Sequence, residues 1–277
     1  MPSEAAGAPG PNLGHAGPRQ VPLTQARLPA PAWGAFTTQA GGGSSAPFSF
    51  LNLSMTVGDD VEDVQANRVA LQGVADVQTL VFGEQVHGAD VAVVGARQSG
   101  TVAGVDALVT TAAGIGLVVL AADCLPVLLA DPVARVAGAA HAGRRGLTAG
   151  VLQATVTAMV RLGAAPSRLQ VRLGPAVCGG CYELPAELAD EVGRTVPGSR
   201  STTRAGTPSI DLAAGARAVL HGLGVGQVEQ VGGCTIEDVR QFSHRRDQPT
   251  GRHAGIIALR PGPAGPGAPV VAEAGRG

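Results

Sequence analysis

Two short segments of this sequence, residues 123–124 and 141–146, combine residue types that can bind a metal ion or an anion. The first reads Asp-Cys and the second His-Ala-Gly-Arg-Arg-Gly. The apolar stretches between them are joined at residues 131–134, which begin with Asp-Pro, a pair typical of turns. If the stretches form an antiparallel hairpin about this turn, Cys124 faces His141. Directly opposed residues have Cβ atoms about 4.5–5.5 Å apart, so this thiol and imidazole could share one metal ion or one substrate atom.

Pro126 and Asp123 constrain how such a hairpin could form. Proline cannot donate a hydrogen bond to a ladder, so pairing near Cys124 is expected at a sheet edge or with an irregular register. Asp123 follows a buried apolar run, where a carboxylate needs a partner. A nearby metal ion or histidine would supply one.

Residues 141–146 lie where a predicted strand gives way to a predicted helix, a position suited to binding an anion. The first amides of a helix have no partner within the helix and point outward. Two arginines between two glycines strengthen the case for phosphate or a similar oxyanion. An ordinary solvated turn is the alternative interpretation.

Nine histidines and cysteines outside the N-terminal stretch could act as metal ligands. They are His87, Cys124, His141, Cys178, Cys181, His221, Cys234, His244 and His253. Taken alone, His87 is more often a capping or core histidine, and Cys124 more often a small buried hydrophobic residue. Cys178 and Cys181 form a Cys-x-x-Cys pair, which is typical of a redox pair or of half a structural zinc site. The sequence has no second such pair, and it lacks the His-x-Glu of cytidine deaminases.

The elements that must position these residues are indicated by apolar β-branched runs that alternate with helical patterns. Strands are predicted at residues 77–82, 90–94, 117–121, 127–130, 136–140 and 169–173, and helices at 61–72, 146–162, 185–192 and 210–223. Several strands are apolar throughout, which predicts burial on both faces. The predicted fold class is therefore α/β, a single layered domain with mixed β-sheets covered by helices.

Composition bounds the remaining possibilities. Residues 1–30 and 261–277 are rich in Pro, Gly and Ala, so we expect disordered tails around one domain at residues 31–260. The net charge is −1 and no basic amphipathic stretch or long apolar span is present, which argues against nucleic acid and membrane partners. Four cysteines without a signal-peptide pattern are better interpreted as thiols or metal ligands of a cytoplasmic protein.

A series of motifs in this sequence resembles one known family. In chain order the motifs are Phe36-Thr-Thr, Leu51-Asn-Leu, Val57-Gly-Asp-Asp, Asn67-Arg, Gly83-Glu-Gln-Val-His-Gly, Asp106-Ala-Leu-Val-Thr, Ala121-Ala-Asp-Cys-Leu-Pro-Val-Leu-Leu-Ala-Asp, Ala139-Ala-His-Ala-Gly-x-Arg-Gly, Leu173-Gly-Pro, Cys181-Tyr-Glu, Cys234-Thr and Ser243-x-Arg-Arg. Together they resemble the bacterial laccase-domain family, also described as the purine nucleoside phosphorylase and peptidoglycan-editing-factor family. The likeness covers roughly residues 34 to 260, and this many ordered motifs make a chance match improbable.

The resemblance implies a single zinc ion held by His87, Cys124 and His141. Three protein ligands would leave a fourth position open, which is typical of a catalytic rather than a structural zinc. It also implies phosphorolysis of purine nucleosides such as adenosine, inosine, guanosine and methylthioadenosine, and deamination of adenosine at the same site. The expected partners are then a small-molecule nucleoside and phosphate, and we expect a monomer.

The same resemblance suggests roles for four further residues. Arg145 matches the family's arginine and is expected to bind the anion, and Arg68 and Arg246 are further candidates for phosphate binding. Asp123 is a candidate catalytic residue beside Cys124, to move a proton or to orient a ligand, and a purely structural carboxylate is its alternative role.

Three departures from the family pattern concern the substrate, because Gln39, Arg144 and His244 replace a usual Arg, Trp and Tyr. The main alternative function is a peptidoglycan editing hydrolase that acts on a UDP-muramyl precursor, with Cys124 as the nucleophile and His141 as the base. Copper-dependent phenol oxidation needs many histidines and is less favoured, so zinc is preferred over copper. A non-enzymatic binding module is disfavoured by the open metal position.

Overall fold

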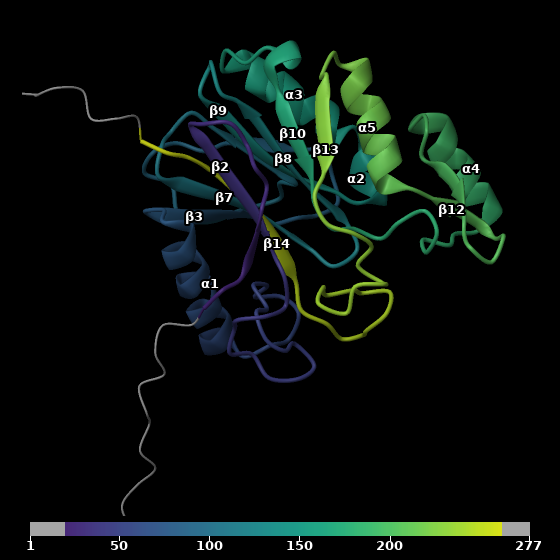
Figure 1. Ribbon diagram of the computed structural model, residues 1–277, viewed down its shortest axis with the longest axis horizontal. Helices are drawn as coiled ribbons and strands as arrows, with labels where there is room; N and C mark the ends of the chain where they lie inside the picture. Colours follow the sequence, from purple (N-terminus) through teal and green to yellow (C-terminus); the bar gives the residue numbers. More distant parts are fainter. Residues whose placement is uncertain (1–19, 262–277) are drawn as a thin grey trace, which may run out of the picture.

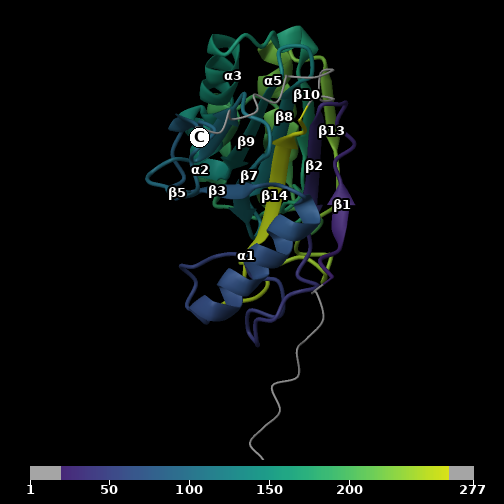
Figure 2. The same ribbon diagram turned by 90° about the vertical axis from the view of Figure 1, so that its left-hand side faces the viewer.

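Two six-stranded β-sheets packed face to face form the centre of the protein, and helices cover both outer faces (Figures 1 and 2). This arrangement is seen in a computed structural model in which residues 20–261 are described. The predicted fold class, α/β with mixed sheets covered by helices, is confirmed.

Both sheets mix parallel and antiparallel pairs. Sheet I has the order β1 (Leu23–Gln25), β2 (Ala32–Thr37), β14 (His253–Leu259), β7 (Ile115–Ala121), β3 (Thr79–Gly83) and β5 (Gly100–Val102). Sheet II has the order β13 (Gln227–Gln230), β10 (Gln170–Leu173), β8 (Leu125–Asp131), β9 (Val136–Ala142), β6 (Ala107–Thr110) and β4 (Val91–Val93). A small antiparallel pair, β11 (Arg200–Thr202) with β12 (Pro208–Ile210), lies apart from both.

Five α-helices are described; most of them lie on the outer faces of the two sheets, and one packs against the small antiparallel pair. They are α1 (Val61–Ala75), α2 (Arg144–Ala149), α3 (Val151–Arg161), α4 (Ala186–Thr195) and α5 (Leu212–Gly222), with a 3-10 turn at Pro166–Arg168. Helix α1 packs on sheet I, whereas α3 and α5 pack on sheet II at the opposite side of the molecule (Figure 1). The helix predicted at residues 146–162 is split in two, because Gly150 takes a left-handed φ of 90° between α2 and α3.

Strand β8 shows how alternation divides the core into layers. Leu128 and Ala130 face the layer between the two sheets, whereas Val127 and Leu129 face the helices that cover sheet II. Each of these side chains is fully buried. The apolar pattern of the predicted strand therefore reflects burial on both faces, as expected, with a second sheet rather than a helix on one of them.

The hairpin between β8 and β9 forms as predicted, but its register is different. Pro126 lies opposite His141, where the sequence analysis placed Cys124. The reason is the turn. Asp131 is the last paired residue of β8 rather than the first turn residue, and its carboxylate accepts hydrogen bonds from the amides of Val133 and Ala134. Arg135, with a φ of 54°, then leads into β9.

The N-terminal boundary also differs from the prediction, because part of the expected tail at residues 1–30 belongs to sheet I. Strand β1 pairs with β2, and the buried Arg172 donates hydrogen bonds to the carbonyls of Ala26 and Arg27. The rest of that tail, residues 1–19, and residues 262–277 of the expected C-terminal tail lie outside the described residues. Within residues 20–261, no helix is long and apolar enough to cross a membrane.

Candidate metal centre and substrate pocket

Asp123 and Cys124 lie where the chain passes from sheet I to sheet II. Strand β7 ends at Ala121 in the first sheet and β8 begins at Leu125 in the second, so only three residues make the crossing. Asp123 takes a φ of 88°, which is uncommon for a residue with a side chain and occurs mainly at functional sites and tight turns. This corner places the Cys124 thiol beyond the end of the β8–β9 ladder.

His87 is held in the loop after β3 by a single carboxylate. The amides of Val86, His87 and Gly88 all donate to Asp106, with N···O distances of 3.1, 3.0 and 2.7 Å. His87 itself has a left-handed φ of 62°. Three successive amides that donate to one buried carboxylate hold the backbone of this loop in place. They therefore also fix the position of the His87 side chain.

The same carboxylate orients His141. Nδ1 of His141 lies 2.8 Å from Oδ1 of Asp106, and both side chains are buried. A histidine that uses Nδ1 in this way presents Nε2 as its metal-binding nitrogen. Asp106 therefore positions both histidines of the cluster at once.

His87, Cys124 and His141 form one group, called here the pocket cluster. Their potential ligand atoms all lie within 4.8 Å of one another. Sγ of Cys124 is 3.9 Å from Nε2 of His87, and the two imidazole rings meet edge to face with centroids 4.9 Å apart. Gly143 leaves room for the sulfur, because a Cβ there would lie 2.7 Å from Sγ of Cys124. The predicted set of three ligands is thus brought together.

The electrostatics of the pocket cluster suit a cation. Burial raises the pKa of the Cys124 thiol, but His141 and His87 outweigh burial and hold this pKa below its usual value. Burial lowers the pKa of His141, whereas the Cys124 thiolate and Asp106 raise it above its usual value. A thiolate beside two imidazoles is a donor set that Zn²⁺ prefers. A bound metal ion would replace the proton shared by Cys124 and His141. The residues present therefore fit a metal ion.

A pocket of about 260 Å³ opens beside the cluster. Its lining combines His87 and Cys124 with cationic and apolar side chains; the lining residues are His87, Ala122, Asp123, Cys124, Arg144, Arg145, Val177, Tyr182, Leu212, His244 and Arg245. Arg145 follows the start of α2, and the guanidinium of Arg245 lies 5.2 Å from the centre of the Tyr182 ring. Three arginines in one pocket make it attractive to an anion.

Two arginines predicted to bind phosphate do not line this pocket. Arg68 lies on α1, where Nε donates to the carbonyl of Leu53 and the guanidinium stacks 3.8 Å from the centre of the Phe82 ring. Arg246 donates to the carbonyls of Thr235, Ile236 and Gln241 and pairs with Asp247. Both guanidinium groups contact neighbouring loops and strands, and Arg245 rather than Arg246 lines the pocket.

Asp123 faces the pocket with both carboxylate oxygens engaged. Oδ1 accepts a 2.5 Å hydrogen bond from the Thr235 hydroxyl, and Oδ2 accepts one of 2.6 Å from the amide of Arg245. Its carbonyl accepts from the amide of Val177. Asp123 thus ties two distant segments to the corner that carries Cys124.

Asp106, which contacts both histidines of the pocket cluster, was not among the predicted site residues. Its signal in the sequence is an acidic residue directly before a buried apolar strand. Tyr182 and Arg245 also lay within motifs without receiving a role. Of the other candidate ligands, His221 pairs with the carbonyl of Val225. His253 is buried, and burial lowers its pKa to about 4.

Comparison with known proteins gives consistent results along most of the chain. A family described as multi-copper polyphenol oxidoreductase laccase matches residues 34–260. A purine nucleoside phosphorylase from Streptomyces griseus is 52% identical over 229 residues, which are 81% of this chain and 93% of that protein. One from Deinococcus radiodurans is 42% identical over 228 residues, covering 81% of this chain and 88% of that protein.

Solved structures show the same architecture. The crystal structure of YlmD from Geobacillus stearothermophilus has a TM-score of 0.78 at 35% identity, covering 84% of this chain and 93% of YlmD. A crystal structure of a Neisseria meningitidis protein has a TM-score of 0.78 at 34% identity, covering 86% of this chain and 99% of that one. The paired sheets that build the pocket are therefore shared with these proteins.

Proposed function

This chain belongs to the multi-copper polyphenol oxidoreductase laccase family, and we propose that it acts as a purine nucleoside phosphorylase with zinc bound by the pocket cluster. One observation carries the proposal. Two of the three potential ligands in the pocket cluster line one pocket together with three arginines, beside a wall of apolar and aromatic side chains. The relatives named purine nucleoside phosphorylase support the substrate class.

Phosphorolysis needs an anion held close to the sugar. A phosphate oxygen forms a bond to C1′ while the bond from C1′ to the purine nitrogen breaks, and the purine leaves with the bonding electron pair. Arg145 and Arg144 begin α2 at the pocket, and Arg245 lies on the loop across from them. Their guanidinium groups can bind phosphate through paired N–H donors and stabilise the negative charge that moves to the base.

The base needs a flat apolar surface. Tyr182 lies in the pocket wall together with Val177 and Leu212. The ring of Tyr182 already stacks against Arg245, so a purine could add to the same stack. Arg144, which replaces an aromatic residue of the family pattern, would leave this stacking role to Tyr182.

His87, Cys124 and His141 would hold the metal ion, with Asp106 behind the two histidines. When bound, zinc would supply Lewis acidity and lower the pKa of a water molecule. The single thiolate and two imidazoles suit zinc, whereas a multi-copper centre requires many more histidines than this pocket contains among its described residues.

Deamination of adenosine in the same pocket is our second proposal. In this reaction water adds to C6 of adenine and ammonia leaves, so a proton must pass from the water to the amino group. Asp123 is a carboxylate in the pocket wall next to Cys124. Its hydrogen bonds to Thr235 and Arg245 hold it at a fixed place, from which it can carry this proton.

Product analysis tests both proposals. The purified protein is mixed with adenosine, with and without phosphate, and the products are identified by mass spectrometry. We expect adenine and ribose 1-phosphate only in the tube with phosphate, and inosine in both. Adenosine that stays intact in both tubes would contradict the proposals and favour an editing hydrolase, which a UDP-muramyl precursor would then test.

A further inference from the structure

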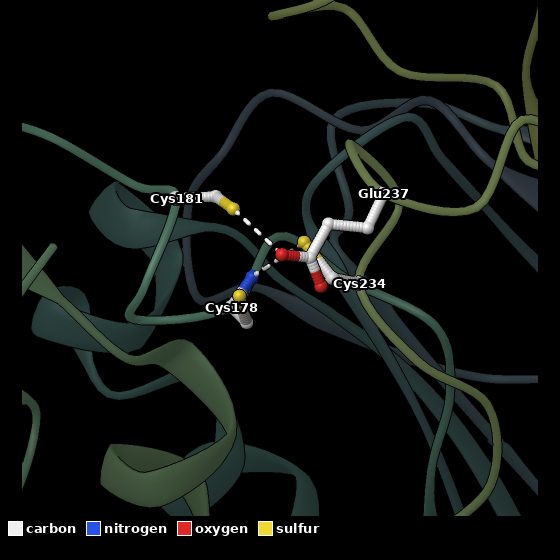
Figure 3. A group of neighbouring side chains, drawn as sticks. All are labelled: Cys178, Cys181, Cys234 and Glu237. Carbon is white, nitrogen blue, oxygen red and sulfur yellow. Dashed lines mark hydrogen bonds between the residues drawn. The ribbon is translucent and has the colours of Figure 1, made fainter. Parts of the chain in front are cut away.

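The Cys178-x-x-Cys181 pair has no part in the pocket cluster, yet the structure does not leave it isolated. Cys234 and Glu237, from a segment more than fifty residues away, lie against it (Figure 3). The three sulfur atoms and a carboxylate oxygen of Glu237 all lie within 4.8 Å of one another. These four residues are called here the cysteine cluster. Their spacing is Cys-x-x-Cys and Cys-x-x-Glu.

Both halves of the cysteine cluster are the same kind of turn. The amide of Cys181 donates to the carbonyl of Cys178 at 3.0 Å, and the amide of Glu237 donates to the carbonyl of Cys234 at 3.2 Å. In each half, the first and fourth residues of the turn supply the two side chains. Paired turns that each present two ligands are the usual construction of structural zinc sites.

The two turns are held against each other by backbone and side-chain contacts. Ala176 and Cys234 form an isolated parallel bridge, and the amide of Thr235 donates to the carbonyl of Ala176 at 3.1 Å. The amide of Cys178 lies 3.4 Å from Sγ of Cys234. Sγ of Cys181 lies 3.4 Å from a carboxylate oxygen of Glu237 (Figure 3).

Arg204 supplies a positive charge at the edge of the cluster. Its Nη1 lies 3.2 Å from Sγ of Cys181 and pairs with Glu237. Three thiolates and one carboxylate around a divalent ion would leave two negative charges in excess, and a guanidinium at hydrogen-bond distance offsets part of that excess. Nothing in a simple Cys178–Cys181 disulfide would account for Cys234, Glu237 and Arg204.

We propose that Cys178, Cys181, Cys234 and Glu237 bind a second zinc ion, with a structural role. Four protein ligands close the tetrahedral coordination shell and leave no position for a substrate. None of the four residues lines the pocket. This ion would be distinct from the metal of the pocket cluster in both ligands and purpose.

The position of the cysteine cluster indicates what the ion would stabilise. Val177 and Tyr182, which flank the first turn, line the pocket. Thr235, which follows Cys234, donates to the carboxylate of Asp123. A metal ion joining the two turns would hold the aromatic wall of the pocket and the partner of Asp123 in one rigid unit.

Metal content of the full-length chain tests this proposal directly. The protein is purified under reducing conditions with added zinc, dialysed, and measured by elemental analysis. We expect about two zinc ions per chain for the wild type, and about one for Cys124→Ala and for Cys181→Ser alike. The double variant Cys124→Ala/Cys181→Ser should bind no zinc. A wild type that binds one zinc ion, lost in Cys124→Ala and kept in Cys181→Ser, would overturn the proposal without affecting the proposed function.

Two further measurements test the proposal even if Cys181→Ser does not fold. Glu237→Gln changes an exposed side chain and keeps all three cysteines, so it should fold, and its loss of zinc affinity at this site should be at least the roughly 10–100-fold that loss of a ligand's hydrogen-bond partner costs. An intact-mass measurement of unreduced wild type counts its thiols. We expect four free thiols when zinc is removed anaerobically, whereas a mass two hydrogens lower, mapped to residues 178–181 in protein kept away from oxidants throughout, would show a disulfide and refute the metal site.

Discussion

The pocket cluster and the cysteine cluster use similar side chains in opposite settings. The pocket cluster has three potential ligands, of which His87 and Cys124 line the pocket and His141 is buried behind it, and a buried carboxylate orients the two histidines. The cysteine cluster has four, at the junction of two turns, and none faces the pocket. The number of protein ligands thus separates the two roles, because a fourth protein ligand occupies the position that a substrate or water would need.

Replacing one cysteine in each cluster should give the largest contrast. Cys124→Ala removes a ligand of the open site, so we expect phosphorolysis to fall by more than roughly 100-fold with little change in melting temperature. Cys181→Ser removes a ligand of the closed site, and we expect mainly a lower melting temperature. Adenine release and thermal unfolding are measured on both. If both variants lost activity and stability to the same extent, the two clusters would not have separate catalytic and structural roles.

Asp106→Asn should weaken the pocket cluster without removing a ligand. The amide side chain cannot accept hydrogen bonds on both atoms, so the His87 loop and His141 lose a common anchor. We expect a roughly 10–100-fold loss of zinc affinity at the pocket cluster, read by competition with a chelating dye. Zinc in the cysteine cluster should be unaffected, and a loss from both clusters would show that Asp106 acts only on the fold.

Arg145→Ala tests the anion side of the pocket, with Arg68→Ala as its matched control. Arg145 lines the pocket, whereas Arg68 packs against Phe82 and Leu53. Loss of one charged hydrogen-bonding group should raise the KM for phosphate about tenfold or more. Arg68→Ala should lower stability with no specific effect on phosphate. An unchanged KM for phosphate in Arg145→Ala would show that Arg145 does not bind phosphate.

Asp131→Asn should have the smallest effect, on stability alone. Burial raises the pKa of Asp131, but Arg168 and the amides of Ala134 and Ala165 outweigh burial and lower this pKa. A lowered pKa stabilises the fold above the unfolded value of about 3.9, and this contribution is lost as pH falls through the folded value.

The wild type should therefore exceed Asp131→Asn by about 1–3 kcal/mol in free energy of unfolding near pH 7. The difference should shrink below about pH 4. Urea denaturation at both pH values measures it. A difference that is constant with pH would show that the side chain acts through packing rather than charge, and a change in adenine release would show that this end of the hairpin is coupled to the pocket.

In the β8–β9 hairpin, local sequence predicted the turn and the strands but not the register. Asp-Pro predicted the turn and the apolar runs predicted both strands, so Cys124 and His141 were expected close together. The register could not be predicted, because it depends on Arg135 adopting a left-handed conformation and on Asp131 remaining paired. The ligands still meet, since Cys124 lies at a corner beyond the ladder, where backbone pairing does not dictate its place.

Long-range contacts account for what the sequence could not predict. The sequence could not show that Arg68 and Arg246 lie outside the pocket lining and donate to backbone carbonyls, because these contacts depend on the fold. The Cys-x-x-Cys pair shows half of a site, and only the fold brings Cys234 beside it. Asp106 precedes an apolar strand in the sequence, and only the fold shows that His87 and His141 share it.

Metal removal and replacement in the wild-type protein shows whether phosphorolysis depends on zinc bound by the pocket cluster. The protein is treated with a chelator, zinc or copper is added back, and phosphate-dependent adenine release and phenol oxidation are measured together. We expect chelation to abolish adenine release and added zinc to restore it, without phenol oxidation. Adenine release that survives complete metal removal, or phenol oxidation restored by copper alone, would show that the reaction does not depend on zinc in the pocket cluster.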